Sequence, residues 1–152
     1  MEIVVVGGGA AGMSVASKAK RVNPSINVTV LERGKYVSYA ECGIPYLLEG
    51  IVKGPEDLLH YPVEEFTKKR GISVRTGTGV VEIRRKEHSL VLSDGSIMQY
   101  DKLILALGAI PKIPEQFASI GIPGIRTLES GEQVRSMLEG SEKVAVIGDG
   151  VL

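Results

Sequence analysis

The residues of this sequence that could do chemistry are one cysteine and one cluster of glycines. Cys42 is the single cysteine, so it cannot form an internal disulfide, and a reducing compartment, the cytoplasm, is expected. Gly43 and Pro45 follow it, a sequence suited to a helix that begins just after the sulfur, and a helix N-terminus favours a thiolate. Glu41 beside it opposes that charge. Because a lone cysteine is usually a buried, inert side chain, both interpretations stay open at this point.

The glycines fit the pattern Gly-x-Gly-x-x-Gly at Gly7, Gly9 and Gly12. In a chain with 19 glycines the bare pattern is a weak signal, and a turn that binds nothing is the alternative. Its context makes it specific, because an apolar run precedes it, a helix rich in small residues follows, and Glu32 ends the next apolar run. Such a loop holds a dinucleotide diphosphate on backbone N–H groups, and the carboxylate accepts hydrogen bonds from the ribose. Since a carboxylate repels a 2′-phosphate, FAD or NAD fits better than NADP.

The elements that must position these residues form an α/β fold, a Rossmann-like domain with a mostly parallel sheet and a small antiparallel β-meander at about residues 78–99. Strands are predicted over residues 3–6, 26–31, 72–75, 80–85, 89–92, 97–99, 103–107 and 143–147. Helices are predicted over residues 10–21, 62–70 and 132–138, and residues 36–50 are predicted to be irregular apart from the turn after Cys42.

The end of the chain repeats its beginning. A predicted strand at residues 143–147 leads into Gly148-Asp149-Gly150, as the first strand leads into its glycines. The sequence therefore predicts a dinucleotide-binding domain over residues 1–110, a linker over residues 111–141 and the truncated start of a second dinucleotide-binding domain over residues 142–152.

Composition excludes several classes of partner. Lys plus Arg and Asp plus Glu are both 18, so the formal net charge is +0 and no broad basic surface is expected for nucleic acid. No apolar run approaches the about 20 residues that span a bilayer, and the first apolar stretch is already a strand, so neither a membrane nor a signal peptide is expected. His60 and His88 lie outside any ligand-like spacing, and we expect no metal site.

The cysteine segment, Ser38-Tyr39-Ala40-Glu41-Cys42-Gly43-Ile44-Pro45-Tyr46, resembles a family motif, Ser-Phe-x-x-Cys-Gly-x-Pro-Tyr. The motif is that of the FAD-dependent pyridine nucleotide–disulfide oxidoreductases, in their single-cysteine branch of coenzyme A disulfide reductases, NADH oxidases and NADH peroxidases. Dithiol members carry a second cysteine five residues later, where this chain has Leu47. Residues 100–109 resemble the family's strand near the flavin, with Leu107 in place of the usual Thr. Residues 126–128 and 143–150 resemble its crossover and the start of its NAD domain.

The resemblance implies the N-terminal portion of a longer, homodimeric flavoenzyme. Residues 1–110 would be its FAD-binding domain, residues 111–141 its crossover and residues 142–152 the truncated start of its NAD(P)H-binding domain. Electrons would pass from NADH or NADPH through FAD to Cys42, the catalytic residue. The acceptor would be coenzyme A disulfide or a related disulfide, through a mixed disulfide, or oxygen or peroxide, through a sulfenic acid. Both routes need one thiolate, so the cysteine does not separate them, and a non-catalytic FAD-binding fragment is a third alternative. The isolated 152 residues are expected to show negligible NADH-dependent turnover.

The motif and its alignment also assign binding residues. The cofactor-binding set is Gly7, Gly9, Ala10, Ala11, Gly12, Glu32, Arg33, Val81, Ala106 and Gly108. The substrate-binding set, matched to the phosphates of coenzyme A, is Ser14, Lys18, Arg21, Ser38 and Arg70. Lys18 and Arg21 share a helix face, an arrangement that is equally typical of a solvated surface. Glu41 stands where coenzyme A disulfide reductases often carry Asn, and an anion there would not help to bind a phosphorylated thiol.

Overall fold

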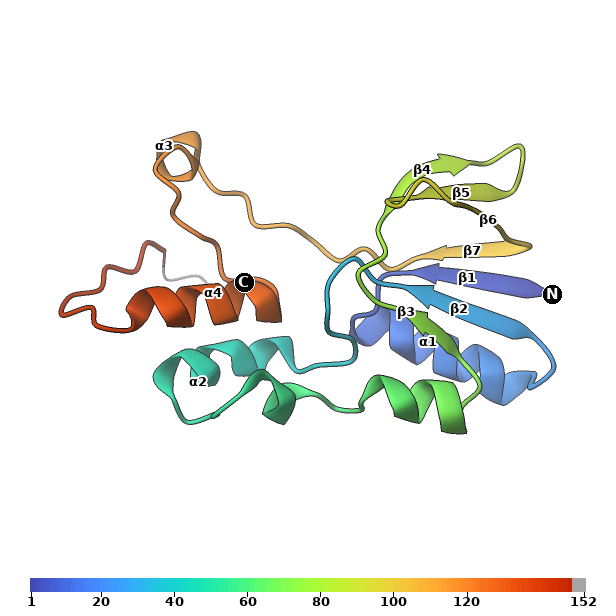
Figure 1. The fold of residues 1–152 in the computed structure, drawn as a ribbon, viewed down its shortest axis with the longest axis horizontal. Helices are drawn as coiled ribbons and strands as arrows, with labels where there is room; N and C mark the ends of the chain where they lie inside the picture. The colour runs from blue at the N-terminus through green and yellow to red at the C-terminus, as the bar shows by residue number, and fades with distance from the viewer. Residues whose placement is uncertain (149–152) are drawn as a thin grey trace.

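A four-stranded parallel sheet is the frame of residues 1–148, the part of the chain that the computed structural model describes (Figure 1). The strand order is β3-β2-β1-β7, so β1 is central and β7, which follows it by about a hundred residues, lies directly beside it. Val4 of β1 pairs with Thr29 on one side and with Leu103 on the other. The four strands are β1 (Glu2–Val6), β2 (Asn27–Leu31), β3 (Ser73–Arg75) and β7 (Lys102–Leu105).

Both faces of this sheet are covered, which explains why residues 3–6 form an uninterrupted apolar run. Val5 packs with Met13 of α1 (Ala10–Val22) and with Phe66 of η3 (Glu65–Lys69) on one face. Val4 packs with Leu90 of the meander on the other. Figure 1 shows α1 and the meander on opposite sides of the strands. The predicted α/β fold with a parallel sheet is confirmed.

The predicted meander is a separate three-stranded antiparallel sheet in the order β4-β5-β6. Its strands are β4 (Val80–Arg84), β5 (Ser89–Leu92) and β6 (Ile97–Gln99). Leu90 pairs with Met98, and the turn between β5 and β6 places Gly95 at a φ of +82°. Because Leu90 and Leu92 are fully buried against the parallel sheet, the meander forms part of the same core.

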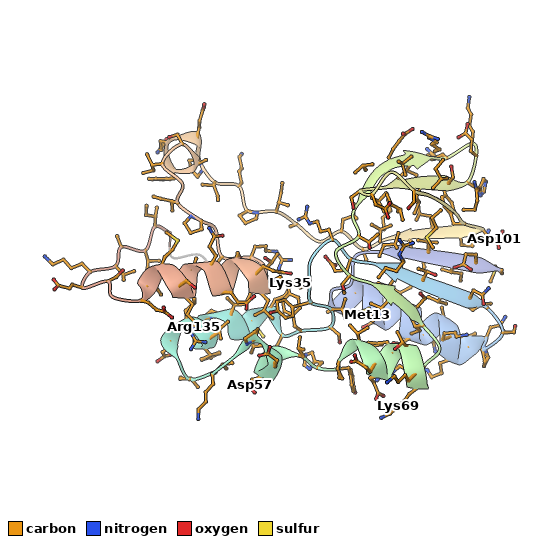
Figure 2. All side chains as sticks on the ribbon, in the orientation of Figure 1. Met13, Lys35, Asp57, Lys69, Asp101 and Arg135 are labelled. Atoms are coloured by element: carbon orange, nitrogen blue, oxygen red, sulfur yellow. The ribbon has the colours of Figure 1, made fainter. Side chains whose placement is uncertain are left out.

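A smaller core lies beside the sheet, where α2 (Ile44–Glu49) packs against α4 (Leu128–Leu138) (Figure 1). Its buried members are Ile44, Leu47, Leu58 and Leu128. Polar contacts join the same parts: Arg135, which Figure 2 shows between α4 and α2, donates to the Lys53 carbonyl at 2.7 Å. Helix α4, which belongs to the crossover, therefore packs against the segment that contains Cys42. Two short 3-10 turns complete that segment, η1 (Glu41–Gly43) and η2 (Pro55–Leu58).

Several predicted boundaries were wrong. The helix predicted at residues 132–138 begins at Leu128, because Thr127 and Ser130 form a reciprocal capping box that fixes its first turn. Residues 36–50 are not irregular throughout, since η1 and α2 occupy residues 41–49. The last strand of the parallel sheet ends at Leu105 and leaves Leu107 exposed. The crossover contains a short helix, α3 (Glu115–Ala118), that was not predicted.

The strand predicted at residues 143–147 does not form. These residues are exposed and outside any helix or strand, and Val146 is 84% exposed. A strand of the parallel-sheet type needs hydrogen-bonded neighbours, and among residues 1–148 none pairs with this segment. Asp149 and Gly150 of the second glycine turn lie outside the described residues. None of the helices in the described part combines the length and apolar character that a membrane crossing demands.

Candidate dinucleotide cleft and cysteine segment

The glycine loop joins β1 to α1, and each of its glycines has a different neighbour. A Cβ on Gly7, which has a φ of +109°, would lie 2.1 Å from the Ala106 carbonyl oxygen. A Cβ on Gly12 would lie 1.9 Å from the Gly7 carbonyl oxygen. A Cβ on Gly9 would meet nothing closer than Glu41 Oε1 at 3.7 Å. Gly7 and Gly12 therefore permit close packing of the protein on itself, whereas Gly9 leaves open space above its backbone.

That open space lies at the N-terminus of α1. Gly9 is the N-cap residue, no side chain caps the helix within the described residues, and the first turn carries no acidic residue. The first N–H groups of a helix have no intrahelical acceptor, and the helix dipole makes this end positive. The geometry and charge of the loop fit an anionic diphosphate.

Glu32, at the end of β2, is held by two backbone N–H groups. Gly8 N donates to its Oε2 at 2.6 Å, and Gly34 N donates to its Oε1 at 2.8 Å. A carboxylate has about four acceptor positions, so each oxygen can still accept from a ribose hydroxyl. The predicted role of Glu32 is compatible with this arrangement.

A cleft of about 430 Å³ connects these groups. It is lined by the glycine loop, by the segment after β2, and by the end of β7 with the crossover. Of the predicted cofactor set, its lining includes Gly9, Glu32, Arg33 and Gly108. Gly7, Gly12 and Ala106 form the packed floor beneath the loop, whereas Val81 lies 67% exposed on β4, away from the cleft lining. The cleft stands where β1 has β2 on one side and β7 on the other, a topological switch point.

Two tyrosines of this cleft hold their protons strongly. Burial, together with a hydrogen bond from its hydroxyl to Glu132 Oε2 at 3.1 Å, raises the pKa of Tyr36 to about 12. Burial also raises the pKa of Tyr39, against the opposing effect of a hydrogen bond that the Leu128 backbone donates to its hydroxyl oxygen. Both phenols are neutral at physiological pH.

Sequence reasoning missed an ion pair inside the cleft. Arg126 Nη1 donates to Glu41 Oε2. The backbone of Arg126 is fixed in turn, because its N–H donates to Ser130 Oγ at 3.0 Å. The capping-box pattern of Thr127 and Ser130 was the available signal in the sequence. It predicts a helix that begins after Thr127, so that Arg126 directly precedes the helix cap and has a fixed backbone.

Cys42 lies in η1 with an exposed side chain. Helix α2 starts directly after it with Pro45 in its first turn, as predicted, although the helix is only six residues long. The backbone is tightly packed, since a Cβ on Gly43 would lie 2.3 Å from Leu58 Cδ2. The segment therefore combines a fixed backbone with an accessible thiol.

A second hollow of about 430 Å³ brings together four of the five predicted substrate residues. Ser14, Arg21, Ser38 and Arg70 line it, and Lys18 is exposed on α1 outside the lining. Tyr39 lines both this hollow and the cleft, so the two adjoin at the start of the cysteine segment.

Arg70 is held in place at this hollow by three kinds of contact. Its guanidinium carbon lies 4.3 Å from the centre of the Tyr61 ring and 4.9 Å from that of Phe66. Nη1 donates to Ser17 Oγ at 3.3 Å, and Nη2 lies 3.6 Å from Glu65 Oε1. Cation–π contacts and hydrogen bonds restrict the guanidinium, so little rotamer freedom remains to be lost on binding an anion.

Ser38 has the unusual backbone of this hollow, a φ of +53°. It is buried, its N–H donates to the Gly8 carbonyl at 2.9 Å, and its carbonyl accepts from His60 N at 2.8 Å. His60, which the sequence places outside any ligand-like spacing, is exposed and lines this hollow. No group of three or more His, Cys, Asp or Glu side chains suited to a metal occurs in the described part of the chain.

Comparison with known proteins agrees with this geometry. A family profile described as pyridine nucleotide-disulphide oxidoreductase matches residues 1–152. The chain is 40% identical over 158 residues to a protein named NAD(P)H sulfur oxidoreductase (CoA-dependent) from Pyrococcus furiosus, covering 99% of this chain and 35% of that protein. It is 34% identical over 160 residues to a protein named NADH oxidase from Methanocaldococcus jannaschii, covering 100% of this chain and 36% of that protein.

A solved structure shows the same fold. The NAD-dependent persulfide reductase of A. fulgidus superposes with a TM-score of 0.82 at 34% identity, over 91% of this chain and 27% of that one. The chain thus spans about a third of the length of the curated relatives it matches.

Proposed function

Because the chain belongs to the pyridine nucleotide-disulphide oxidoreductase family, we propose that it is the FAD-binding part of an NAD(P)H-dependent reductase of coenzyme A disulfides or persulfides. Cys42 is the redox residue in this proposal. The glycine loop and Glu32 bind the adenosine diphosphate half of FAD, and Ser14, Arg21, Ser38 and Arg70 bind the phosphorylated thiol.

The hollow beside the cysteine segment carries this proposal. It contains two guanidinium groups, and Arg70 is already oriented by Tyr61 and Phe66 before any ligand arrives. Guanidinium groups recognise phosphates through paired, charge-assisted hydrogen bonds. Aromatic rings next to the guanidinium also suit a ligand that carries an adenine base. Oxygen or peroxide would need none of these groups.

An anion beside Cys42 would oppose binding of a phosphorylated thiol if it faced the second hollow, but Glu41 points elsewhere. Its carboxylate pairs with Arg126 and lines the dinucleotide cleft, while the lining of the second hollow does not include it. The carboxylate of Glu41 is therefore turned away from Arg21 and Arg70 of the second hollow and is partly neutralised by Arg126.

The chemistry of Cys42 follows from its exposure and from the absence of a second cysteine in the sequence. Its thiolate attacks one sulfur of a disulfide, forming a mixed disulfide and releasing the other half as a thiol. FAD held in the cleft would supply the two electrons, taken from a nicotinamide, that together with two protons reduce the mixed disulfide to two thiols. Because these 152 residues contain no second cysteine that could resolve the mixed disulfide, its reduction in this proposal depends on the cofactor cleft next to the cysteine segment.

Thiol exchange at Cys42 tests the substrate class without requiring turnover. The reduced chain is mixed with coenzyme A disulfide or with pantethine, which has the same disulfide but lacks the phosphates, and mixed-disulfide formation is followed by mass spectrometry. We expect the coenzyme A compound to react about tenfold faster, since one charge-assisted contact of about 1.5 kcal/mol corresponds to that factor. Arg70→Gln is expected to lose most of the difference, and Lys68→Gln, which changes an exposed residue outside the hollow, to retain it.

Equal rates with the two disulfides would contradict the coenzyme A assignment. A second candidate, an oxidase that works through a cysteine sulfenic acid, is favoured by the relative named NADH oxidase. It predicts instead that hydrogen peroxide converts Cys42 stoichiometrically to a dimedone-reactive form faster than either disulfide reacts.

A further inference from the structure

The pair formed by Glu41 and Arg126 joins the two banks of the dinucleotide cleft. We propose that it is a clasp that closes the cleft in the FAD-free chain and opens when the cofactor's diphosphate settles on the glycine loop. The inference rests on the proposed binding of FAD. It concerns how much the need to break this ion pair lowers the affinity for FAD.

The two residues come from opposite sides of the cleft. Glu41 precedes Cys42 in η1, and its Oε1 is the nearest atom to the open space above Gly9. Arg126 comes from the crossover, 85 residues away, and its Nη2 would lie 3.4 Å from a Cβ on Gly108 at the end of β7. The pair thus runs from the N-terminus of α1 to the carboxyl end of β7. A dinucleotide that crosses the switch point must pass between these two places.

Charge explains why Glu41 is in this position. The N-terminus of α1 is positive and lacks a side-chain cap, so the nearby carboxylate of Glu41 is stabilised there and by Arg126. A diphosphate on the loop carries charge of the same sign and would repel that carboxylate. The other charged side chains that line the cleft are Glu32, Arg33, Lys35 and Glu129. These contain two acids and two bases, so they offer Glu41 no net compensation once the cofactor enters.

The pair is weak enough to open. The side chains of Arg126 and Glu41 are 32% and 43% exposed. Partly exposed ion pairs typically change an equilibrium by about two- to fivefold. The clasp would therefore weaken FAD binding measurably but would not prevent it. Once Glu41 leaves, Arg126 is free to face the bound anion.

Binding of FAD itself to the whole chain tests this clasp. Dissociation constants are measured from the quenching of flavin fluorescence for the wild type, Glu41→Gln, Arg126→Gln and the double variant. Glu49→Gln is the matched control, because Glu49 is an exposed acid on the same segment outside the cleft lining. Each variant's unfolding temperature without FAD is recorded to verify folding.

We expect Glu41→Gln to bind FAD about two- to fivefold more tightly than the wild type, and Glu49→Gln to bind it equally. Arg126→Gln should bind it more weakly, since it leaves the carboxylate unpaired above the loop. The decisive quantity is the double-mutant cycle. In this cycle, the Kd of the wild type is multiplied by that of the double variant, and the result is divided by the product of the two single variants' Kd values. We expect a ratio of about two to five, because only the wild type must break the ion pair to bind FAD.

A closed cycle, with a ratio of one, in a chain that binds FAD would overturn the clasp and leave the proposed function intact. Equal affinities of Glu41→Gln and Glu49→Gln would do the same. Failure of the wild type and of every variant to bind FAD would instead contradict the proposed function. The two failures are therefore distinguishable in one set of titrations.

Discussion

A side-chain carbon at Gly12 would lie 1.9 Å from the carbonyl oxygen of Gly7, too close for any rotamer to relieve. The same carbon at Gly9 would make only an ordinary van der Waals contact, with Glu41 Oε1 at 3.7 Å. The two glycines of this loop therefore have different roles: Gly12 allows the loop to pack closely, and Gly9 leaves room for a ligand.

Substitution by alanine should separate these purposes. We expect Gly12→Ala to destabilise the chain by about 3 kcal/mol, because rigid backbone atoms must move apart. Gly9→Ala should leave the free energy of unfolding within about 0.5 kcal/mol of the wild type. It should weaken FAD binding by about tenfold, since the added methyl group keeps the diphosphate from the backbone. Urea denaturation and flavin-fluorescence titration measure the two effects, and a stable Gly12→Ala variant would refute the packing role.

Gly131 of α4 lies against α2, the helix that follows Cys42 in the chain, where a Cβ would be 2.7 Å from Ile44 Cγ2. Alanine favours a helix by about 1 kcal/mol, but overpacking a buried contact costs about 1–3 kcal/mol, so Gly131→Ala should lower stability by about 1 kcal/mol. Gln133→Ala, on the exposed side of the same helix, should show no loss. Thermal unfolding monitored by circular dichroism checks both. An equal gain in both variants would mean that the α2–α4 contact is loose.

The raised pKa of Tyr36 predicts that the free energy of unfolding falls at high pH. Its folded-state pKa is about 12, above the ordinary value of 10.0, so only the unfolded chain gains by releasing the proton above pH 10. The stabilisation is complete below pH 10 and declines as the pH rises toward 12. Tyr36→Phe should remove this part of the decline, while Tyr46→Phe, an exposed ring, should keep it. Urea midpoints at pH 9 and pH 11 give the comparison, and identical shifts in both variants would exclude Tyr36 as the cause.

The purified 152-residue chain should take up FAD but should show negligible oxidation of NADH. Within residues 1–148 one glycine loop is framed by a strand and a helix, and the second glycine turn follows a segment that forms no strand. Stopped-flow anaerobic mixing of the FAD-loaded chain with NADH, followed at the flavin absorbance, measures the rate. Rapid bleaching would contradict this expectation and would place a nicotinamide site within these residues.

The parts of the fold that sequence could predict are those specified by neighbours in the chain. The apolar run at residues 3–6, the glycines after it and Glu32 after the next run follow the βαβ pattern, and the structure has β1, α1 and β2 in those places. The meander was predictable because a glycine-containing turn separates two short apolar runs. Both depend on local spacing and on the periodicity of burial.

No local pattern in the sequence specifies the missed features. Glu41 and Arg126 are 85 residues apart, and no local pattern in the sequence pairs them. The orientation of Arg70 over Tyr61 and Phe66 depends on the π-helical turn at η3, where a regular helix was expected. The strand expected at residues 143–147 had the right composition, but a β-strand also needs partners, which composition does not reveal.

The small core of Ile44, Leu47, Leu58 and Leu128 has no member in common with the two clusters that hold the sheet. Cooperative units of this kind can open on their own, with a free energy below that of global unfolding. Native-state hydrogen exchange should therefore resolve two levels of protection, a lower one for α2 and α4 and a higher one for β1 and β2. The cysteine segment would then unfold locally while the parallel sheet stays folded. A partner or ligand that binds this segment could therefore change how ordered the region around the Cys42 thiol is without unfolding the sheet.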